Sequence, residues 1–393
     1  MRRIFLFAQI YFVQGVALAY FQNFQKPYLN GQGISPQVIG LLTGILLLPF
    51  VFKIFLGLLS DRVNLFRMGH RRPYIIIGLL LGCCSFLAAG FISPSEHFFL
   101  FSGCIVIGSF SVTMFDSTTD GLAIETTPES EHGRIQGIMV GSRAAAFIIL
   151  SLVFGFIVQR SGYFWVFALI AAAMLIPAAS AFSIKEPGRP SGDFDWSAFR
   201  VMITPRFGVF ALYAILYSAV SFGVDGQITL YLAREFHAPE SMIGNYGALR
   251  GIGACLGALL GGFVMDRIGH RQVGVIALVC VSIAAAFLGF APSINWMYGL
   301  GIVWGMAWAF QETVFFAVAM DIADVRIAAS MFAISMAISN FGTAGAEAIF
   351  TGLAAAKGYS LVFWTLACFN ILTIGVLLWL FRVRKKDEIN ASV

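Results

Sequence analysis

Charged side chains are scarce in this sequence, since Asp, Glu, Lys and Arg together make up only 11% of its 393 residues. An average soluble protein contains about 25% charged and roughly 45–50% apolar residues. Hydrophobic residues reach 59% here, which excludes an ordinary soluble domain and indicates a chain that lies mostly in a lipid bilayer. The net charge of +5 does not indicate a nucleic-acid partner, because the basic residues are spread over short segments between apolar runs.

Cysteines are also few, and all six lie inside apolar runs. Their spacing is typical neither of a disulfide framework nor of a metal site, so the sequence predicts neither, and we expect no cofactor. The chain passes from Met1-Arg2-Arg3 directly into an apolar run without a small-residue cleavage site. We therefore expect a first membrane helix there rather than a removed signal peptide.

The apolar runs predict an all-α membrane protein with twelve transmembrane helices. About 20 residues are needed to cross the hydrocarbon core as a helix. Most of the 25 Lys and Arg residues fall in loops on the side of the N-terminus, which predicts a cell-membrane protein with both termini cytoplasmic, in the inner membrane if the cell is Gram-negative. The predicted spans cover approximately residues 4–24, 37–59, 73–92, 98–119, 135–158, 163–183, 207–232, 241–264, 272–291, 295–319, 327–354 and 359–381.

The two halves of the chain share a repeated loop. After the second span the sequence reads Gly57-Leu-Leu-Ser-Asp61-Arg62 and then Gly69-His70-Arg71. After the eighth it reads Gly262-Phe-Val-Met-Asp266-Arg267 and then Gly269-His270-Arg271. The repeat predicts two six-helix domains joined by a linker rich in Pro, Gly and charge and followed by a basic cytoplasmic tail. Their expected bounds are 1–183 and 207–381 for the domains, 184–206 for the linker and 382–393 for the tail.

The duplicated G-x-x-x-D-R loop followed by G-x-R resembles the signature loop of the major facilitator superfamily, and the resemblance covers the whole chain. It implies two pseudo-symmetric six-helix bundles, with the loop joining them on the cytoplasmic face and holding the outward-open state. The alternative, that these loops only anchor the chain through positive charges on the cytoplasmic side, explains the arginines of the motif but not the aspartate in each copy. We assign gating to the motif residues, to Asp321 near the cytoplasmic end of its span and to Asp225 nearer the outside, which gives the set Asp61, Arg62, Arg71, Asp266, Arg267, Arg271, Asp321 and Asp225.

A narrower resemblance points to two groups within that superfamily. The segment Pro49-Phe-Val-Phe-Lys53, followed by Gly69-His-Arg-Arg-Pro73, resembles folate-biopterin transporters, and its Val-Phe-Lys part also resembles anhydromuropeptide permeases and their acetyl-coenzyme A transporter relatives. The segment Asp116-Ser-Thr-Thr-Asp120 is similar to both groups. Gly133-x-Ile-Gln136 favours the folate-biopterin transporters, whereas Arg143 favours the muropeptide permeases. The resemblance therefore leaves the substrate open.

Acids inside the predicted spans need a reason, because placing a charge there costs about 2.5–3.5 kcal/mol. Asp116 has a counterpart at Asp321, which favours a gating or charge-relay role over direct ion binding, and Asp120 belongs to the same region. Glu312, near the middle of its span, is the strongest candidate for coupling, because a low dielectric favours the protonated carboxyl group. We assign proton coupling to Glu312, Asp116 and Asp120.

Two arginines lie deep in spans without a basic counterpart in the other half. A guanidinium group binds a carboxylate or phosphate in a fork, so Arg143 and Arg250 are candidates for binding an anionic part of a substrate. The alternatives are a structural salt bridge for Arg143 and pairing with Asp225 for Arg250. Lys53 either snorkels to the membrane surface or has a role inside the bundle.

Uncharged polar and aromatic residues complete the predicted substrate site. Glutamine and tyrosine side chains in spans can bond to a solute or to another helix, and both readings stay open. Aromatic residues of the tenth span can stack on a planar ring such as a pterin or serve packing alone. The candidates are Gln14, Tyr20 and Gln311 for hydrogen bonds, and Trp304, Trp308 and Phe315 for stacking.

Together these features predict a secondary active transporter. We expect it to move a small polar solute, anionic or zwitterionic and folate-, pterin- or muropeptide-like, by proton-coupled alternating access. Its expected partners are this solute and the bilayer, with no nucleic acid, and the expected state is a monomer. The alternatives are a non-transporting receptor or scaffold, a lipid flippase of the same fold, and a membrane prenyltransferase that uses Asp116 and Asp120 to bind magnesium; the duplicated loop speaks against this enzyme.

Overall fold

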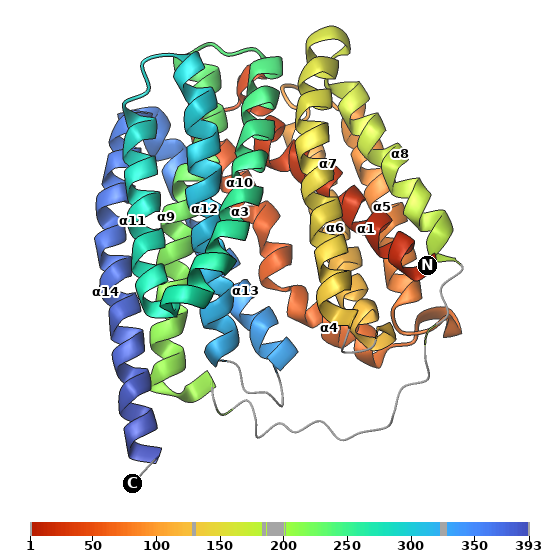
Figure 1. Cartoon of the computed structure of the whole chain (residues 1–393). Helices are drawn as coiled ribbons and strands as arrows, with labels where there is room; N and C mark the ends of the chain where they lie inside the picture. Colours follow the sequence, from red (N-terminus) through yellow and green to blue (C-terminus); the bar gives the residue numbers. More distant parts are fainter. Residues whose placement is uncertain are drawn as a thin grey trace. The chain divides into compact units, whose positions relative to one another are not determined.

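The computed structural model describes residues 2–127, 131–182, 186, 200, 202–322 and 328–391. All regular elements in these residues are helical (Figure 1). In chain order they are α1 (Arg2–Ala19), η1 (Tyr20–Phe24), α2 (Gln25–Gly31), α3 (Pro36–Val51), α4 (Lys53–Arg62), η2 (Leu65–Arg67), α5 (Arg72–Gly90), α6 (Phe98–Thr126), α7 (His132–Ser161), α8 (Tyr163–Ala181), α9 (Pro205–Glu235), α10 (Glu240–Ile268), α11 (His270–Gly289), α12 (Ile294–Ile322), α13 (Ala328–Lys357) and α14 (Tyr359–Ala391).

Each predicted span coincides with one helix or with consecutive helices. Ten helical segments of the described part are long and apolar enough to cross a membrane, and the first of them runs through α1, η1 and α2. The two other predicted spans correspond to α13 and to the shorter apolar helix α3 with α4. The prediction of an all-helical, multi-pass membrane protein is therefore confirmed. Several helices continue beyond their apolar runs, as α6 does to Thr126.

Two membrane helices of the N-terminal half are irregular. A π-helical turn at Tyr20–Phe24 interrupts the first span, a few residues before Pro27, which has no N–H for the helical hydrogen bond. The second span is broken at Phe52, whose φ of −90° and ψ of 7° separate α3 from α4. Pro49 in the last turn of α3 likewise removes a helical hydrogen bond. Such irregular turns are frequent at functional sites.

The chain forms two compact units. Unit 1 contains Met1–Pro190 and Thr229–Ala248, and unit 2 contains Ser191–Ile228 and Leu249–Val393. The domain bounds expected from the sequence stay a prediction. Most of the expected linker at 184–206 lies outside the described residues, and the backbone of α14 remains helical through the expected tail as far as Ala391.

Small residues let helices approach closely within unit 1. α1 packs against α7, and α5 packs against α6 and α8. A side chain at Gly15 of α1 would collide with the backbone carbonyl of Arg143 in α7. A side chain at Gly78 of α5 would lie 3.1 Å from the backbone of α6 at Ser111 and Phe115. Glycine at these positions therefore allows backbone-to-backbone packing, as is common in membrane helices.

The beginning of α10 also packs against α7 within unit 1. A Cβ atom at Gly155 of α7 would lie 2.8 Å from the carbonyl of Glu240, and one at Gly244 of α10 would collide with the carbonyl of Ser151. Next to this contact, the Asn23 amide donates a hydrogen bond of 2.8 Å to the Ser151 hydroxyl. Two glycines and one polar bond thus hold α7, α10 and the π-helical turn together.

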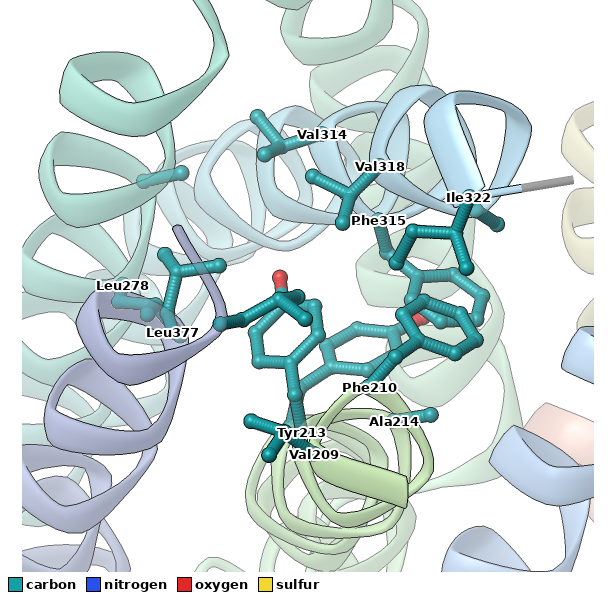
Figure 2. Close-up of a cluster of buried hydrophobic side chains, with 14 of the residues drawn as sticks. Val209, Phe210, Tyr213, Ala214, Leu278, Val314, Phe315, Val318, Ile322 and Leu377 are labelled. Atoms are coloured by element: carbon teal, nitrogen blue, oxygen red, sulfur yellow. The ribbon is translucent and has the colours of Figure 1, made fainter. Parts of the chain in front are cut away.

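The core of unit 2 is an aromatic and aliphatic cluster, of which Figure 2 shows the part between α9, α11, α12 and α14. The ring of Phe315 stacks on Phe210 at 5.9 Å and on Tyr217 at 4.6 Å between centroids. Leu278 and Leu377 are fully buried in the same cluster. Phe315, a candidate for stacking on a substrate ring, therefore packs in the protein core.

Candidate functional site

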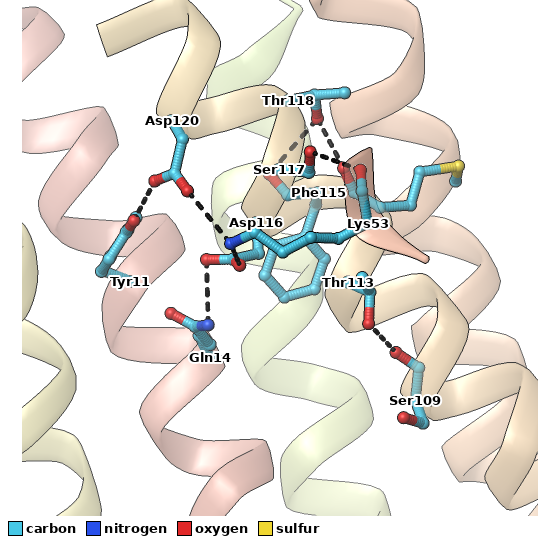
Figure 3. Close-up of polar contacts among 11 residues, drawn as sticks. Tyr11, Gln14, Lys53, Ser109, Thr113, Phe115, Asp116, Ser117, Thr118 and Asp120 are labelled. Carbon is cyan, nitrogen blue, oxygen red and sulfur yellow. Dashed lines mark hydrogen bonds and ion pairs between the residues drawn. The ribbon is translucent and has the colours of Figure 1, made fainter. Parts of the chain in front are cut away.

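A cluster of polar side chains lies inside unit 1, where α1, α4 and α6 meet (Figure 3). The Lys53 ammonium nitrogen is 3.4 Å from Oδ2 of Asp116 and 3.6 Å from Oδ2 of Asp120. Gln14 donates a hydrogen bond of 2.9 Å from Nε2 to Oδ1 of Asp116, and the Tyr11 hydroxyl donates to Oδ1 of Asp120. We call these five residues the carboxylate cluster.

The local helix geometry explains how the cluster forms. Asp116 and Asp120 are four residues apart on α6, and Tyr11 and Gln14 are three apart on α1, so each pair shares one helix face. Lys53 is the first residue of α4, directly after the break at Phe52, and its carbonyl accepts a hydrogen bond of 3.2 Å from the Ser117 hydroxyl. The break therefore places the lysine against α6, where both carboxylates bind it, and Lys53 does not snorkel.

Burial differs within the cluster. The side chain of Asp116 is 7% exposed, that of Lys53 18% and that of Asp120 33%. Asp116 is thus enclosed by its partners, whereas Asp120 keeps access to the surroundings of unit 1. The assignment of Asp116 and Asp120 to proton coupling stays a prediction.

Arg143 of α7 lies beside the cluster. Its guanidinium carbon is 6.0 Å from the centre of the Tyr11 ring, and the side chain is half-buried. Among the residues that the structure describes, no carboxylate lies within salt-bridge distance of this guanidinium group. None of the described carboxylates therefore forms the salt bridge that was the alternative to anion binding, and the role of Arg143 stays a prediction. Lys53 and Arg143 together balance the charges of Asp116 and Asp120.

Arg250, the second deep arginine, is paired within unit 2. Its guanidinium group donates to Oδ2 of Asp225, and the indole N–H of Trp304 donates to Oδ1 of the same carboxylate at 2.7 Å. The Arg250 guanidinium also lies over the ring of Trp308, 5.8 Å from its centre. Asp225 and Arg250, predicted as a gate and a substrate contact, thus bind each other. This pairing was the alternative role that the sequence left open for Arg250. Their roles stay predictions.

The other predicted substrate contacts lie at separate places in the units. In unit 2, Gln311 is fully buried and accepts a hydrogen bond of 2.9 Å from Ser221. Glu312 follows it on α12 with a half-buried side chain. In unit 1, Tyr20 is fully buried between aromatic rings, with Phe167 at 4.9 Å, so a solute would have to displace these rings to reach it. Gln14 belongs to the carboxylate cluster.

Glu347 of α13 forms a further polar contact inside unit 2. Its carboxylate accepts bonds of 3.5 Å from Gln227 and 3.3 Å from Thr351. Gly226 makes room for it, because a side chain there would collide with the carboxylate. The Glu347 carboxylate therefore joins α13 to α9.

The first copy of the repeated loop is held by Arg71. Its guanidinium group is 2.8 Å from Oε1 of Glu125 at the end of α6 and 2.5 Å from the Ser60 hydroxyl in α4. The side chain is 7% exposed. Arg71 therefore ties α4, α5 and α6 together at one end of unit 1, and its gating role stays a prediction. The side chains of Asp61 and Arg62 lie outside the described part.

A carboxylate from beyond α8 closes the same loop. Glu186 accepts hydrogen bonds of 2.6, 2.8 and 2.6 Å from the backbone N–H groups of His70, Arg71 and Arg72. These groups have no helical partner at the start of α5, and a negative charge is favourable there. Gly69, with a φ of 114°, leaves space for the carboxylate.

The second copy of the loop has different partners. Asp321 of α12 is 2.6 Å from Nδ1 of His270, and its backbone carbonyl accepts a bond of 3.3 Å from Arg206. Arg267 stacks on Phe263 at 4.0 Å, and Arg271 is exposed. The side chain of Asp266 lies outside the described part. The two copies are therefore not equivalent in their polar contacts.

Several residues at these sites were not recognised from the sequence. Glu125, Glu186 and His270 each bind a predicted gating residue, yet nothing in their local sequence indicates which arginine, backbone group or aspartate they meet. Trp304 was considered for stacking, and its hydrogen bond to Asp225 depends on how α9 and α12 are rotated. For Lys53, the nearby Pro49 was an available signal, because a helix break in a span often accompanies a polar site.

Curated proteins with related sequences are transporters. The chain is 30% identical to the folate-biopterin transporter of Synechocystis sp. over 188 residues, which cover 45% of this chain and 36% of that protein. It is 24% identical over 324 residues to the uncharacterized MFS-type transporter YwfA of Bacillus subtilis, covering 80% of this chain and 77% of that one. The match to the folate-biopterin transporter thus spans little more than a third of that relative.

The fold has solved counterparts. A bacterial homologue of the human lysosomal transporter Spinster, in an inward-facing and unoccupied conformation, matches with a TM-score of 0.79 at 17% identity over 98% of this chain and 97% of that one. This likeness shows the fold alone, and it confirms the predicted fold class. The sequence model of the family described as Major Facilitator Superfamily matches this chain at residues 4–229 and again at residues 210–392. With matches over nearly its whole length, the chain belongs to the Major Facilitator Superfamily.

Proposed function

We propose that this protein is a secondary active transporter that carries a small anionic or zwitterionic organic solute by proton-coupled alternating access, with both termini in the cytoplasm. The observation that carries the proposal is the carboxylate cluster with Arg143 beside it. Charges inside membrane helices are costly and mark ion or substrate pathways. Here four of them meet within one unit of a Major Facilitator Superfamily chain.

The cluster supports a proton step. Asp120 is the more exposed carboxylate and shares Lys53 with Asp116. A proton on Asp120 removes one of the two negative charges that hold the lysine, so that Lys53 then pairs with Asp116 alone. Protonation also leaves the positive charges of Lys53 and Arg143 in excess by one. The protonated cluster therefore attracts an anion, which links proton uptake to the binding of an anionic solute.

Arg143 is the proposed anion contact. Its guanidinium group has no salt-bridge partner among the described residues, and its planar fork matches a carboxylate or phosphate. The neighbouring Tyr11 ring offers an apolar face to a flat solute. Together with the name of the Synechocystis relative, these contacts favour a pterin-like ring that carries a carboxylate. Muropeptides, the other class expected from the sequence, remain in the test.

Transport by purified protein in proteoliposomes tests the proposal. Uptake of labelled folates, reduced pterins and muropeptides should be measured with and without an imposed pH gradient. We expect Arg143→Lys to lower uptake about tenfold or more, because one fork-like contact is worth about 1.4 kcal/mol or more. Arg160→Lys is the control, since Arg160 is exposed at the other end of α7. Equal uptake by Arg143→Lys and the parent would exclude the proposed anion contact.

A second pair of variants locates the coupling acid. Asp120→Asn should abolish accumulation driven by the pH gradient but permit downhill exchange, because its amide cannot release a proton. Glu312→Gln tests the other predicted acid in the same assay. If only Glu312→Gln loses coupling, the proton site lies in unit 2 and the cluster has another role. If no solute of the panel is taken up under any gradient, the transport proposal itself fails for these classes.

A further inference from the structure

The carboxylate cluster surrounds one positive charge with oxygen atoms. Two carboxylates, from Asp116 and Asp120, face the Lys53 ammonium group. The side-chain oxygen of Gln14 is buried and has no hydrogen-bond partner among the described residues, while its nitrogen donates to Asp116. Gln14 is only 3% exposed, so this free acceptor is buried next to Asp116, which Gln14 binds through its nitrogen. Oxygen ligands of these kinds are the ones that hard cations prefer.

The lysine binds both carboxylates. Its ammonium group donates a hydrogen bond of 3.4 Å to Oδ2 of Asp116 and is 3.6 Å from Oδ2 of Asp120. The ammonium group thus lies between the two carboxylates and supplies one positive charge to them. Another cation of single charge would serve the same electrostatic purpose.

The charge count selects a monovalent ion. With Arg143 beside the Tyr11 ring, the two carboxylates need one more positive charge for balance, and Lys53 supplies it. Removing the lysine leaves one uncompensated negative charge among buried groups, which is unfavourable. A monovalent cation restores the balance, whereas Mg²⁺ or Ca²⁺ would leave an excess of one positive charge.

We propose that the carboxylate cluster is a monovalent-cation site whose resident cation is the chain's own Lys53 ammonium group, and that a chain without this lysine binds Na⁺ there. The lysine is attached at the start of α4, so its effective concentration at the site is high and Na⁺ does not displace it in the parent protein. This inference goes beyond the transport proposal, because it concerns ion binding within unit 1 and does not depend on the transported solute.

Sodium binding to purified full-length variants tests this inference. The melting temperature of Lys53→Ala should rise by about 3 °C when N-methylglucamine chloride is replaced by NaCl at about a hundred times the dissociation constant, at constant ionic strength. The parent protein and Lys53→Arg should show no such rise, because each keeps a tethered cation. Lys357→Ala removes an exposed lysine at the end of α13 and serves as the matched control.

Two further measurements assign the binding to the cluster. Labelled ²²Na⁺ should bind to Lys53→Ala with one ion per chain, and the double variant Lys53→Ala/Asp120→Asn should lose this binding because it lacks one of the two carboxylates. Methylammonium should also stabilise Lys53→Ala, since it resembles the missing end of the lysine side chain.

The following outcomes would overturn the inference. Folded Lys53→Ala with the same melting temperature in both salts shows that no ion enters, as when a proton balances the charge instead. Sodium binding that persists in the double variant places the ion elsewhere. Lys53→Ala that fails to fold in NaCl and in methylammonium chloride shows that no free cation replaces the lysine. Uptake assays do not enter this test, so its result is independent of the transport proposal.

Discussion

Replacing Asp225 by asparagine tests how unit 2 stabilises its buried arginine. The side chains of Arg250 and Asp225 are 6% and 10% exposed. Asparagine keeps the size of the side chain and can still accept the hydrogen bond from Trp304, so that the substitution removes little more than the negative charge. Breaking a buried pair by removing one partner typically costs about 3–5 kcal/mol. We expect Asp225→Asn to lower the free energy of unfolding by this amount.

The double variant Asp225→Asn/Arg250→Met provides the comparison that makes the test specific. Methionine replaces the long side chain without its charge, so neither partner remains buried as an unpaired ion. Because replacing both members of a buried pair is often close to neutral, we expect the double variant to regain most of the loss and to lie within about 2 kcal/mol of the parent. Arg250→Met alone should be less stable than the double variant.

Reversible unfolding in mixed micelles, titrated with a denaturing detergent and followed by circular dichroism, gives the required free energies. A surface ion pair would contribute only about 0–1 kcal/mol. If Asp225→Asn is as stable as the parent, the pair does not stabilise unit 2. If the double variant is less stable than either single variant, the two side chains act through separate contacts rather than as a charge pair.

Two further predictions concern unit 1. Glu186→Ala should speed hydrogen exchange at the amides of residues 70–72 by about tenfold or more, because three N–H groups lose a charged acceptor. Exchange within α9 is the internal reference, and unchanged rates at residues 70–72 would contradict the contact. Gly244→Val should separate α10 from α7 and increase the thiol labelling of a cysteine introduced at Ser151. Gly262→Val is its control, since nothing lies within 4 Å of a side chain there, and equal labelling of both variants would contradict the predicted collision.

Much of the fold could be predicted from the sequence, because a bilayer requires long apolar helices. Every predicted span coincides with helical structure in the described residues, and the repeated loops lie where α4 and α10 end. The π-helical turn was not predicted, because Pro27 lies beyond the end of the predicted first span at residue 24. Pro49 was a signal for the break at Phe52, but a proline alone does not tell whether a helix bends or breaks. The extension of α6 to Thr126 was missed for another reason: helices can continue into water, where apolar runs stop.

Many of the residues at these sites could be singled out from the sequence, but the partner that each of them contacts could not. Lys53 and Asp116 are far apart in the sequence, and whether they meet depends on how α4 and α6 are rotated and tilted. The comparison of repeats placed Asp116 and Asp321 at equivalent positions of their spans but could not give the partners of either aspartate. In the structure Asp116 binds Lys53 and Gln14 inside unit 1, whereas Asp321 binds His270 and is 27% exposed. A repeated position fixes where a charge lies along a helix, but its partners are set by neighbours that differ between the halves.

The break at Phe52 has a consequence for how the two copies diverged in length. Asp61 follows Pro36 by 25 positions, whereas Asp266 follows Pro239 by 27. In an unbroken helix, a difference of two residues turns the end by about 200° and shortens it by about 3 Å. The second copy is one continuous helix, α10, while the first is divided into α3 and α4. Because the break uncouples the rotation of α4 from that of α3, a difference of two residues between the copies does not have to turn the end of α4 by the same angle.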